Sequence, residues 1–156
     1  MTIKSICQTK VITVSKNSTL KDIATLMYKH HVGSVIITEG LDGKRIPAGI
    51  ITDRDIALAI GSSQKPQDLS VDKIMKPHPV TISCDAGLFE TALRMREIGV
   101  RRLPVVNSDG SLYGVISADD LLSLMGEEIS NISKITDAQI MNEQGALRPK
   151  ETHVQF

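Results

Sequence analysis

Two short stretches of the chain place a carboxylate three residues after a hydroxyl group. They pair Thr52 with Asp55 and Ser117 with Asp120, and each follows an apolar, β-branched run. One interpretation is a capping box, in which the hydroxyl caps a helix and the carboxylate reaches back to the main chain. The other is a ligand site, because N–H groups at a helix start attract phosphate and a carboxylate can accept hydrogen bonds from ribose hydroxyls. Both interpretations use the same geometry.

Two adjacent arginines, Arg101 and Arg102, enter a predicted strand. Burying a guanidinium without a partner is costly, and phosphate is a partner that it can bind through two hydrogen bonds. A solvated strand edge, or ion pairs with a partner subunit, would account for these arginines without a ligand.

These residues recur because the chain contains an internal repeat. A shift of 68 positions, which takes Leu20 to Leu88, aligns the first parts of two copies. A shift of 65, which takes Gly49 to Gly114, aligns their last parts. The slip falls in turn-rich stretches at 38–46 and 107–113, where surface loops tolerate insertion. The sequence therefore predicts one copy at 3–60, a linker at 61–70, a second copy at 71–125, and a C-terminal extension at 126–156.

Each copy has the pattern of a β-α-β-β-α unit. In the first, strands are expected at 11–14, 34–38 and 48–52, with one helix capped by Ser18 or Thr19 and another starting near Asp53. In the second, strands are expected at 80–82, 102–106 and 113–117, with helices starting near Asp85 and Ala118. Units of this size bury little surface alone. The prediction is an α+β fold in which two copies pack with pseudo-twofold symmetry and form two related clefts.

Composition excludes several classes of function. Eighteen basic residues balance 18 acidic ones, so no bulk charge attracts nucleic acid or a membrane. Tryptophan is absent and aromatics make up 3%, which leaves little to stack on bases. The start lacks the apolar core of a secretory signal and no run is long enough to span a membrane, so a cytoplasmic location is expected.

The reactive residue types lack catalytic or metal-binding spacing. Cys7 and Cys84 form no disulfide framework and are expected as small buried hydrophobes. The histidines at 30, 31 and 78 have no carboxylate or thiol at ligand spacing, so no metal is expected. No phosphate-binding glycine loop of the Walker type and no nucleophile with a base occurs. We therefore expect a protein that is not an enzyme.

The C-terminal extension is unlike either copy. Ile129, Ile132 and Ile135 continue a helical spacing and predict that the last helix reaches about Ile135. Beyond Asp137 the sequence is polar with an isolated Phe156, which fits either a mobile tail or a segment that packs on a neighbouring subunit.

The repeated pattern resembles the CBS-domain family, whose tandem pair is called a Bateman module. The resemblance is carried by residues 71–93 and 99–122, and more weakly by 11–27 and 49–57. It implies two β-α-β-β-α motifs that form a flat disc, and discs of this family commonly dimerise. It also implies adenosine nucleotides bound in the clefts as regulatory ligands.

The resemblance assigns roles in a first cleft. Asp55 is expected to take the ribose hydroxyls, Thr52 and Arg54 the phosphate, and Pro79 with Val80 the adenine. The residues expected to line this cleft are Ile50, Thr52, Arg54, Asp55, Pro79, Val80, Val100, Arg101, Arg102 and Pro104.

The second cleft carries the matching positions from the other copy. Its expected lining is Val11, Ile12, Val32, Gly33, Ser34, Ile36, Val115, Ser117, Asp119 and Asp120. Asp119 stands where the first cleft has Arg54, and Gly33 with Ser34 stand where it has Arg101 and Arg102. His31 is nearby but is mostly neutral at pH 7. The sequence therefore predicts that the first cleft binds AMP, ADP or ATP more tightly. The second would be empty, weak, or suited to a less anionic compound such as S-adenosylmethionine.

Two hypotheses follow for the whole chain. The leading one is an energy or metabolite sensor that binds a nucleotide, forms a homodimer through CBS–CBS packing and signals to an unidentified effector protein. The second is a structural or interaction module whose clefts are vestigial. The intact Thr52–Asp55 pair and the nearby arginines favour the sensor.

Overall fold

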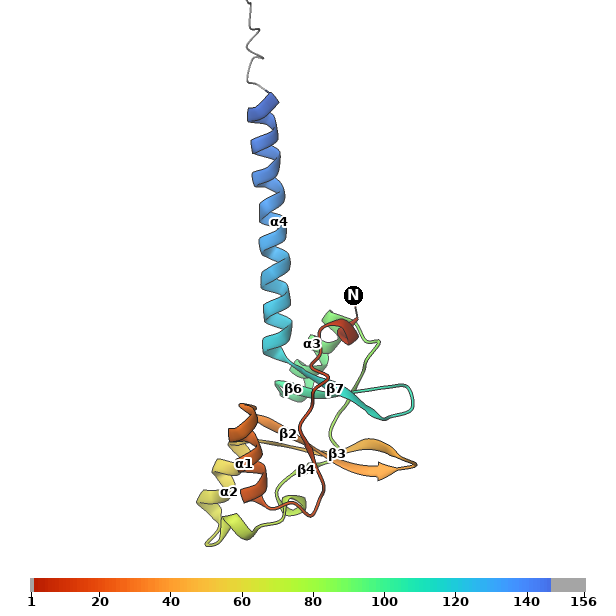
Figure 1. Ribbon diagram of the computed structural model, residues 1–156, viewed down its shortest axis with the longest axis vertical. Helices are drawn as coiled ribbons and strands as arrows, with labels where there is room; N and C mark the ends of the chain where they lie inside the picture. Colours follow the sequence, from red (N-terminus) through yellow and green to blue (C-terminus); the bar gives the residue numbers. More distant parts are fainter. Residues whose placement is uncertain (1, 147–156) are drawn as a thin grey trace, which may run out of the picture. The chain divides into compact units, whose positions relative to one another are not determined.

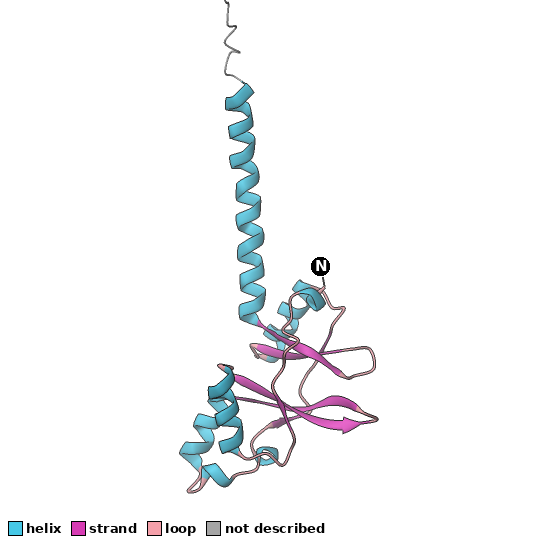
Figure 2. Cartoon of the chain, in the orientation of Figure 1, coloured by secondary structure: helices cyan, strands magenta, loops and turns pink. Residues whose placement is uncertain are grey.

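The computed structural model describes residues 2–146 (Figure 1). The chain divides into two compact units, residues 1–120 and residues 121–156. Within the described part of the first unit, the strands form two sheets, drawn in magenta in Figure 2. The predicted α+β fold of two β-α-β-β-α motifs is confirmed.

The first copy and one strand from the opening segment of the second copy form a four-stranded sheet covered by two helices. Its strands are β1 (Thr13–Val14), β2 (Ser34–Leu41), β3 (Lys44–Thr52) and β4 (Lys76–Pro77), in the order β1-β2-β3-β4. Helices α1 (Leu20–His30) and α2 (Asp53–Ser62) pack together against it. The fully buried side chains of Ile23, Val35, Ile37 and Ile51 join α1 to the sheet in one apolar core. A short 3₁₀ helix, η2 (Pro66–Asp68), follows α2.

The second copy repeats the arrangement with three strands, β5 (Ile82–Ser83), β6 (Arg102–Val106) and β7 (Leu112–Ser117), in that order. Helix α3 (Leu88–Ile98) is the counterpart of α1. In both copies the first strand pairs parallel with the second, and the second pairs antiparallel with the third. Leu103, Val105 and Ile116 are almost completely buried and form the apolar centre of this sheet.

Several predicted boundaries move by a few residues. The stretch at 38–46 is mostly strand, because a tight turn at Asp42 and Gly43 lets β2 and β3 continue as a hairpin. Both residues have positive φ, at 48° and 75°, which is the geometry that Asp-Gly favours in two-residue hairpins. The first strands of the copies, expected at 11–14 and 80–82, start later, and α3 is capped at Gly87 rather than near Asp85.

Each copy's opening segment packs on the other copy. The 3₁₀ helix η1 (Ile3–Ser5) sits against the second copy, where the main-chain N–H of Ile3 donates to Ala86 O at 3.0 Å. Figure 1 shows this red N-terminal segment beside α3. The equivalent 3₁₀ helix η3 (Val71–Lys73) and strand β4 instead join the first copy, and Val71 is buried in its core. The two sequence repeats are therefore interlocked.

The packing of each opening segment on the other copy explains a glycine in each copy. A Cβ atom on Gly114 would lie 2.7 Å from the main-chain oxygen of Gln8, which forms an isolated bridge with Val115. Gly49 lies in the equivalent place, where β4 pairs alongside it. Only a residue without a side chain lets the foreign segment approach this closely.

Helix α4 (Ala118–Ala146) closes the second copy and continues into the second unit. The predicted end near Ile135 is wrong, because the helix runs on through Asp137 to Ala146. The polar residues beyond Ile135 include Gln139, Glu143 and Gln144, which are good helix formers, so loss of apolar spacing does not end the helix. Ile129, Ile132 and Ile135 are exposed on α4. Phe156 lies outside the described residues.

Candidate functional site

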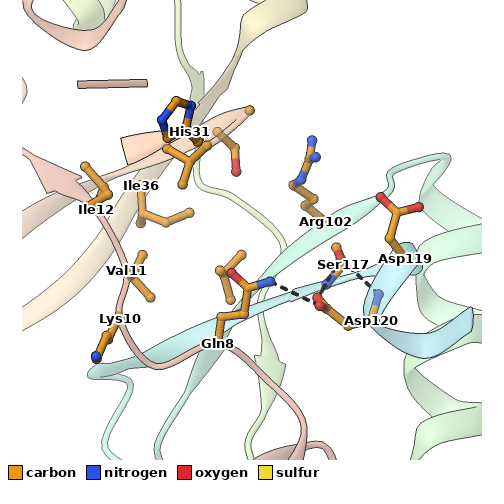
Figure 3. A pocket seen from close by; sticks show the side chains of 14 residues that line it. Gln8, Lys10, Val11, Ile12, His31, Ile36, Arg102, Ser117, Asp119 and Asp120 are labelled. Carbon is orange, nitrogen blue, oxygen red and sulfur yellow. Dashed lines mark hydrogen bonds between the residues drawn. The ribbon is translucent and has the colours of Figure 1, made fainter. Parts of the chain in front are cut away.

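A cavity of about 230 Å³ lies at the predicted second cleft, and both copies line it. We call it the Asp120 cavity. All ten residues expected at the second cleft line it. Four further side chains complete the lining, namely Gln8, Lys10, His31 and Arg102 (Figure 3).

The sequence prediction missed Gln8 and Lys10 because they lie in the exchanged opening segment. The 68-residue shift relates Gln8 to Lys76 and Lys10 to His78. Lys76 and His78 in turn line the cavity at the first predicted cleft. The alignment thus pairs these residues between the copies, but it gives no signal that either pair lines a cavity.

Asp120 is fixed by a capping box at the start of α4. The main-chain N–H of Ser117 donates to Asp120 Oδ2 at 2.8 Å, and the main-chain N–H of Asp120 donates to Ser117 Oγ at 3.2 Å. On the other side, Gln8 Nε2 donates to Asp120 Oδ1 at 3.1 Å, as the dashed lines in Figure 3 show. The capping interpretation thus holds, and it leaves the carboxylate pointing into a cavity.

Both cations and carboxylates line this cavity. Lys10 and Arg102 supply positive charge, and Asp119 and Asp120 supply negative charge. Arg101 Nη2 lies 2.9 Å from Asp119 Oδ1, so an arginine already balances Asp119. Repulsion of an anion by Asp119 was expected because no arginine stands at the matching positions of this cleft, but the structure places Arg101 and Arg102 there.

The first predicted cleft contains a second cavity of about 260 Å³, which we call the Pro79 cavity. Six of its ten predicted residues line it: Ile50, Pro79, Val80, Val100, Arg102 and Pro104. Lys76, Pro77, His78, Ile98 and Leu103 complete the lining.

Four predicted residues do not line the Pro79 cavity. Thr52 and Asp55 form a capping box at the start of α2, with the Thr52 N–H 2.8 Å from Asp55 Oδ2. Asp55 lines a separate, open hollow beside Leu58 and Lys73. Arg54 is exposed at the start of α2, and Arg101 is exposed and paired with Asp119. The Thr52–Asp55 motif is thus formed as a cap but is not joined to the cavity opposite.

Other reactive groups show no organised centre. Across residues 2–146 no group of three His, Cys, Asp or Glu side chains could hold a metal ion. Cys84 is buried and Cys7 is half-buried, and burial raises the pKa of the Cys7 thiol above its ordinary value. In that same part of the chain, no helix combines the length and apolarity needed to cross a membrane.

Two interlocked copies of one motif that share a polar cavity define a tandem-repeat module. The family model described as "CBS domain" matches residues 3–62 and 71–127. The chain therefore belongs to the CBS-domain family.

Two curated relatives illustrate the match. An uncharacterised protein of Methanopyrus kandleri is 33% identical over 125 residues, which cover 80% of this chain and 62% of that protein. The CBS domain-containing protein YhcV of Bacillus subtilis is 30% identical over 137 residues, covering 84% of this chain and 94% of that one. The chain spans less than two thirds of the first relative and nearly all of the second.

Solved structures share the fold. The CBS domain pair of protein MJ0100, in complex with 5′-methylthioadenosine and S-adenosyl-L-methionine, superposes with a TM-score of 0.72 at 24% identity. The superposition covers 82% of this chain and 98% of the MJ0100 chain. CBSX2 in complex with AMP gives a TM-score of 0.70 at 21% identity, over 81% of this chain and 96% of that one.

Proposed function

We propose that this chain is a non-catalytic regulatory module that binds an adenosine-type ligand in the Asp120 cavity and signals its presence to a partner protein. The observation that carries the proposal is a cavity lined by both copies, with a carboxylate held at the start of a helix. Because both copies line it, a ligand can favour one packing of the copies over another, and a partner that distinguishes the two states can respond.

The lining suits the parts of such a ligand. Val11, Ile12, Ile36 and Val115 offer apolar surface for a base. Asp120 can accept hydrogen bonds from ribose hydroxyls. Lys10 and Arg102 can neutralise a phosphate. The adenosine compounds bound in the CBSX2 and MJ0100 structures support this class of ligand.

The choice among ligands rests on charge. AMP, ADP or ATP would use the two cations, whereas S-adenosylmethionine would set its positive groups against Asp119 and Asp120. The sequence prediction that the Asp55 cleft binds more tightly stays a prediction. The cavity geometry favours the opposite ranking, because Asp120 faces its cavity and Asp55 lines a different hollow.

Isothermal titration with AMP, ADP, ATP and S-adenosylmethionine tests the proposal. Nucleotide-free wild type is compared with Asp120→Ala and with Asp55→Ala. Both variants lose a capping box, so each controls for the other's effect on helix stability. We expect Asp120→Ala to weaken binding by about 10-fold or more, the effect of losing hydrogen bonds to a charged group, and Asp55→Ala to leave the main binding event unchanged.

Two results would contradict this assignment. Loss of binding in Asp55→Ala alone would restore the ranking predicted from sequence. No heat with any of the four compounds would favour the second candidate function, a protein-interaction module. That alternative draws on the exposed apolar residues Ile129, Ile132 and Ile135 of α4, which are 64–67% exposed. It would be pursued by measuring the oligomeric state.

A further inference from the structure

We propose that Arg102 couples the two cavities, so that a phosphate-bearing ligand in one weakens the binding of a second such ligand in the other. This inference rests on the proposed function and concerns its regulation. Among the residues that the structure describes, Arg102 is the one that lines both the Asp120 cavity and the Pro79 cavity.

The position of Arg102 in the fold explains why it lines both cavities. It is the first residue of β6 and pairs across the sheet with Ser117, the hydroxyl residue of the Asp120 cap. Its half-buried side chain projects from β6 into the Asp120 cavity, as Figure 3 shows. The next two residues, Leu103 and Pro104, line the Pro79 cavity.

The guanidinium lies over the main chain of Gly33. A Cβ atom built on Gly33 would be 3.4 Å from Arg102 Nη2 and 3.7 Å from Nη1. The same point is 3.4 Å from Asp53 Oδ2, at the start of α2. A side chain at position 33 would therefore meet both Arg102 of the second copy and Asp53 of the first, and glycine leaves the Arg102 side chain room to move.

Each cavity has other positive groups, and they do not substitute for Arg102. Lys10 lines the Asp120 cavity and Lys76 lines the Pro79 cavity, and both are exposed side chains. Arg101 is engaged by Asp119. In the described chain, Arg102 is thus the one arginine among the residues of the two linings, and its side chain projects into the Asp120 cavity. Guanidinium is the group that can hold phosphate through two parallel hydrogen bonds.

The guanidinium projects into the Asp120 cavity, so we infer that it must turn away from that cavity to bind a phosphate in the Pro79 cavity. A phosphate in one cavity therefore fixes Arg102 on that side and leaves the other cavity with its lysine alone. The linkage is reciprocal, because each ligand must change the other's affinity by the same factor. We expect a factor of at least about 5, within the range of about 5 to 150 typical of coupled sites.

The test measures each cavity separately by NMR. Amide signals of Gly33 and Val115 report the Asp120 cavity, and those of His78 and Val80 report the Pro79 cavity. AMP is titrated into the full chain, which shows which cavity binds it more tightly. It is then titrated into a variant in which a tryptophan fills that tighter cavity. The variant is Val11→Trp for the Asp120 cavity or Val80→Trp for the Pro79 cavity. We expect AMP to bind the unplugged cavity at least about fivefold more tightly than the same cavity in the wild type.

Arg102→Gln, added to the plugged variant, should remove this gain. Arg94→Gln should keep it, because Arg94 is an exposed arginine on α3 that pairs with Glu97 and lines neither cavity. Adenosine, which lacks phosphate, should bind the unplugged cavity equally in the plugged and wild-type proteins. An unchanged affinity for AMP after plugging would overturn the coupling.

A second measurement needs no plug. The side-chain Nε–Hε signal of Arg102, assigned by its loss in Arg102→Gln, should move with the first AMP binding event and stay still with adenosine. If AMP saturates the cavity amides and this signal does not move, Arg102 does not hold phosphate and the coupling is overturned while the proposed function stands. If neither AMP nor adenosine shifts any cavity amide, the proposed function fails as well.

Discussion

At the scale of single residues, the two oxygens of Asp120 have different partners. Oδ2 accepts hydrogen bonds from Ser117 as part of the helix cap, and Oδ1 accepts one from Gln8 at 3.1 Å. The cap bonds belong to the start of α4, whereas an exposed side-chain amide can rotate away at little cost. A ribose that binds Asp120 would therefore compete with Gln8 rather than with the cap.

Gln8→Ala is expected to tighten the binding of AMP at the Asp120 cavity by about 2- to 10-fold. The ligand would no longer have to displace a hydrogen bond whose net contribution is about 0.5–1.5 kcal/mol. Isothermal titration measures the change, with the neighbouring exposed residue substituted as the control, Thr9→Ala. Weaker binding in Gln8→Ala would mean instead that the amide orients Asp120 or contacts the ligand.

At the scale of elements, the crossing of an opening segment over a strand leaves no room for a side chain at the strand position beneath it. In the second copy, the N–H and C=O of Gln8 exchange hydrogen bonds with those of Val115, each 2.9 Å long. The crossing carries Gln8 and Lys10 to the Asp120 cavity, so the strand glycine serves both the fold and the site.

Gly114→Ala should destabilise the protein by about 1–3 kcal/mol, the usual cost of forcing an extra methyl group into a packed site. Its Cβ would meet the Gln8 oxygen at 2.7 Å and Cys7 Sγ at 3.1 Å, and the oxygen belongs to the backbone. Gly40→Ala is the matched control, because a Cβ there meets nothing within 4 Å. Urea unfolding followed by circular dichroism compares the two. Equal stabilities would refute the steric account of the crossing.

Sequence patterns predict the elements of this fold well and the crossing poorly. Apolar spacing places α1 and β6, because one face of each element must be buried. The hydroxyl–carboxylate pairs place the starts of α2 and α4, because both pairs form helix caps. The same alignment cannot tell which copy an opening segment packs on, since Ile3 and Val71 are equivalent in both arrangements. Gln8 and Lys10 were missed for that reason. The place of Arg102 depends on the space that Gly33 of the other copy leaves for its guanidinium, which no periodicity encodes.

At the scale of the whole folded unit, charged groups also connect the copies. Lys44 Nζ, in the β2–β3 hairpin of the first copy, lies 2.7 Å from Asp109 Oδ2, in the β6–β7 loop of the second. Hydrogen bonds from Lys44, and then from Ser111, hold the pKa of Asp109 well below its ordinary value. Because the carboxylate is exposed, this pair is a probe of pH dependence more than a main source of stability.

Asp109→Asn should lower stability at neutral pH but not in acid. The pKa of Asp109 is depressed in the folded state, so its contribution is present above the unfolded value of about 3.9 and is lost as the pH falls below it. Melting temperatures measured from pH 7 to pH 2 should show a gap between wild type and variant that closes below about pH 4. Lys44→Gln removes the residue that lowers the pKa of Asp109 most. In a protein that carries Lys44→Gln, the difference in melting temperature caused by Asp109→Asn should therefore be smaller. A gap independent of pH would assign the effect to packing.

The interlocking of the two copies has a consequence for how the protein is made. Ile3, at the start of the chain, donates its N–H to Ala86, and Gln8 pairs with Val115. During synthesis the first copy can complete its core once Val71 and Met75 have left the ribosome, because both belong to that core. The opening segment of the first copy has no strand to pair with until β7 emerges. Although these residues are made before the second copy, they are therefore among the last to find their native contacts, and closing this long loop is expected to be a slow step of folding.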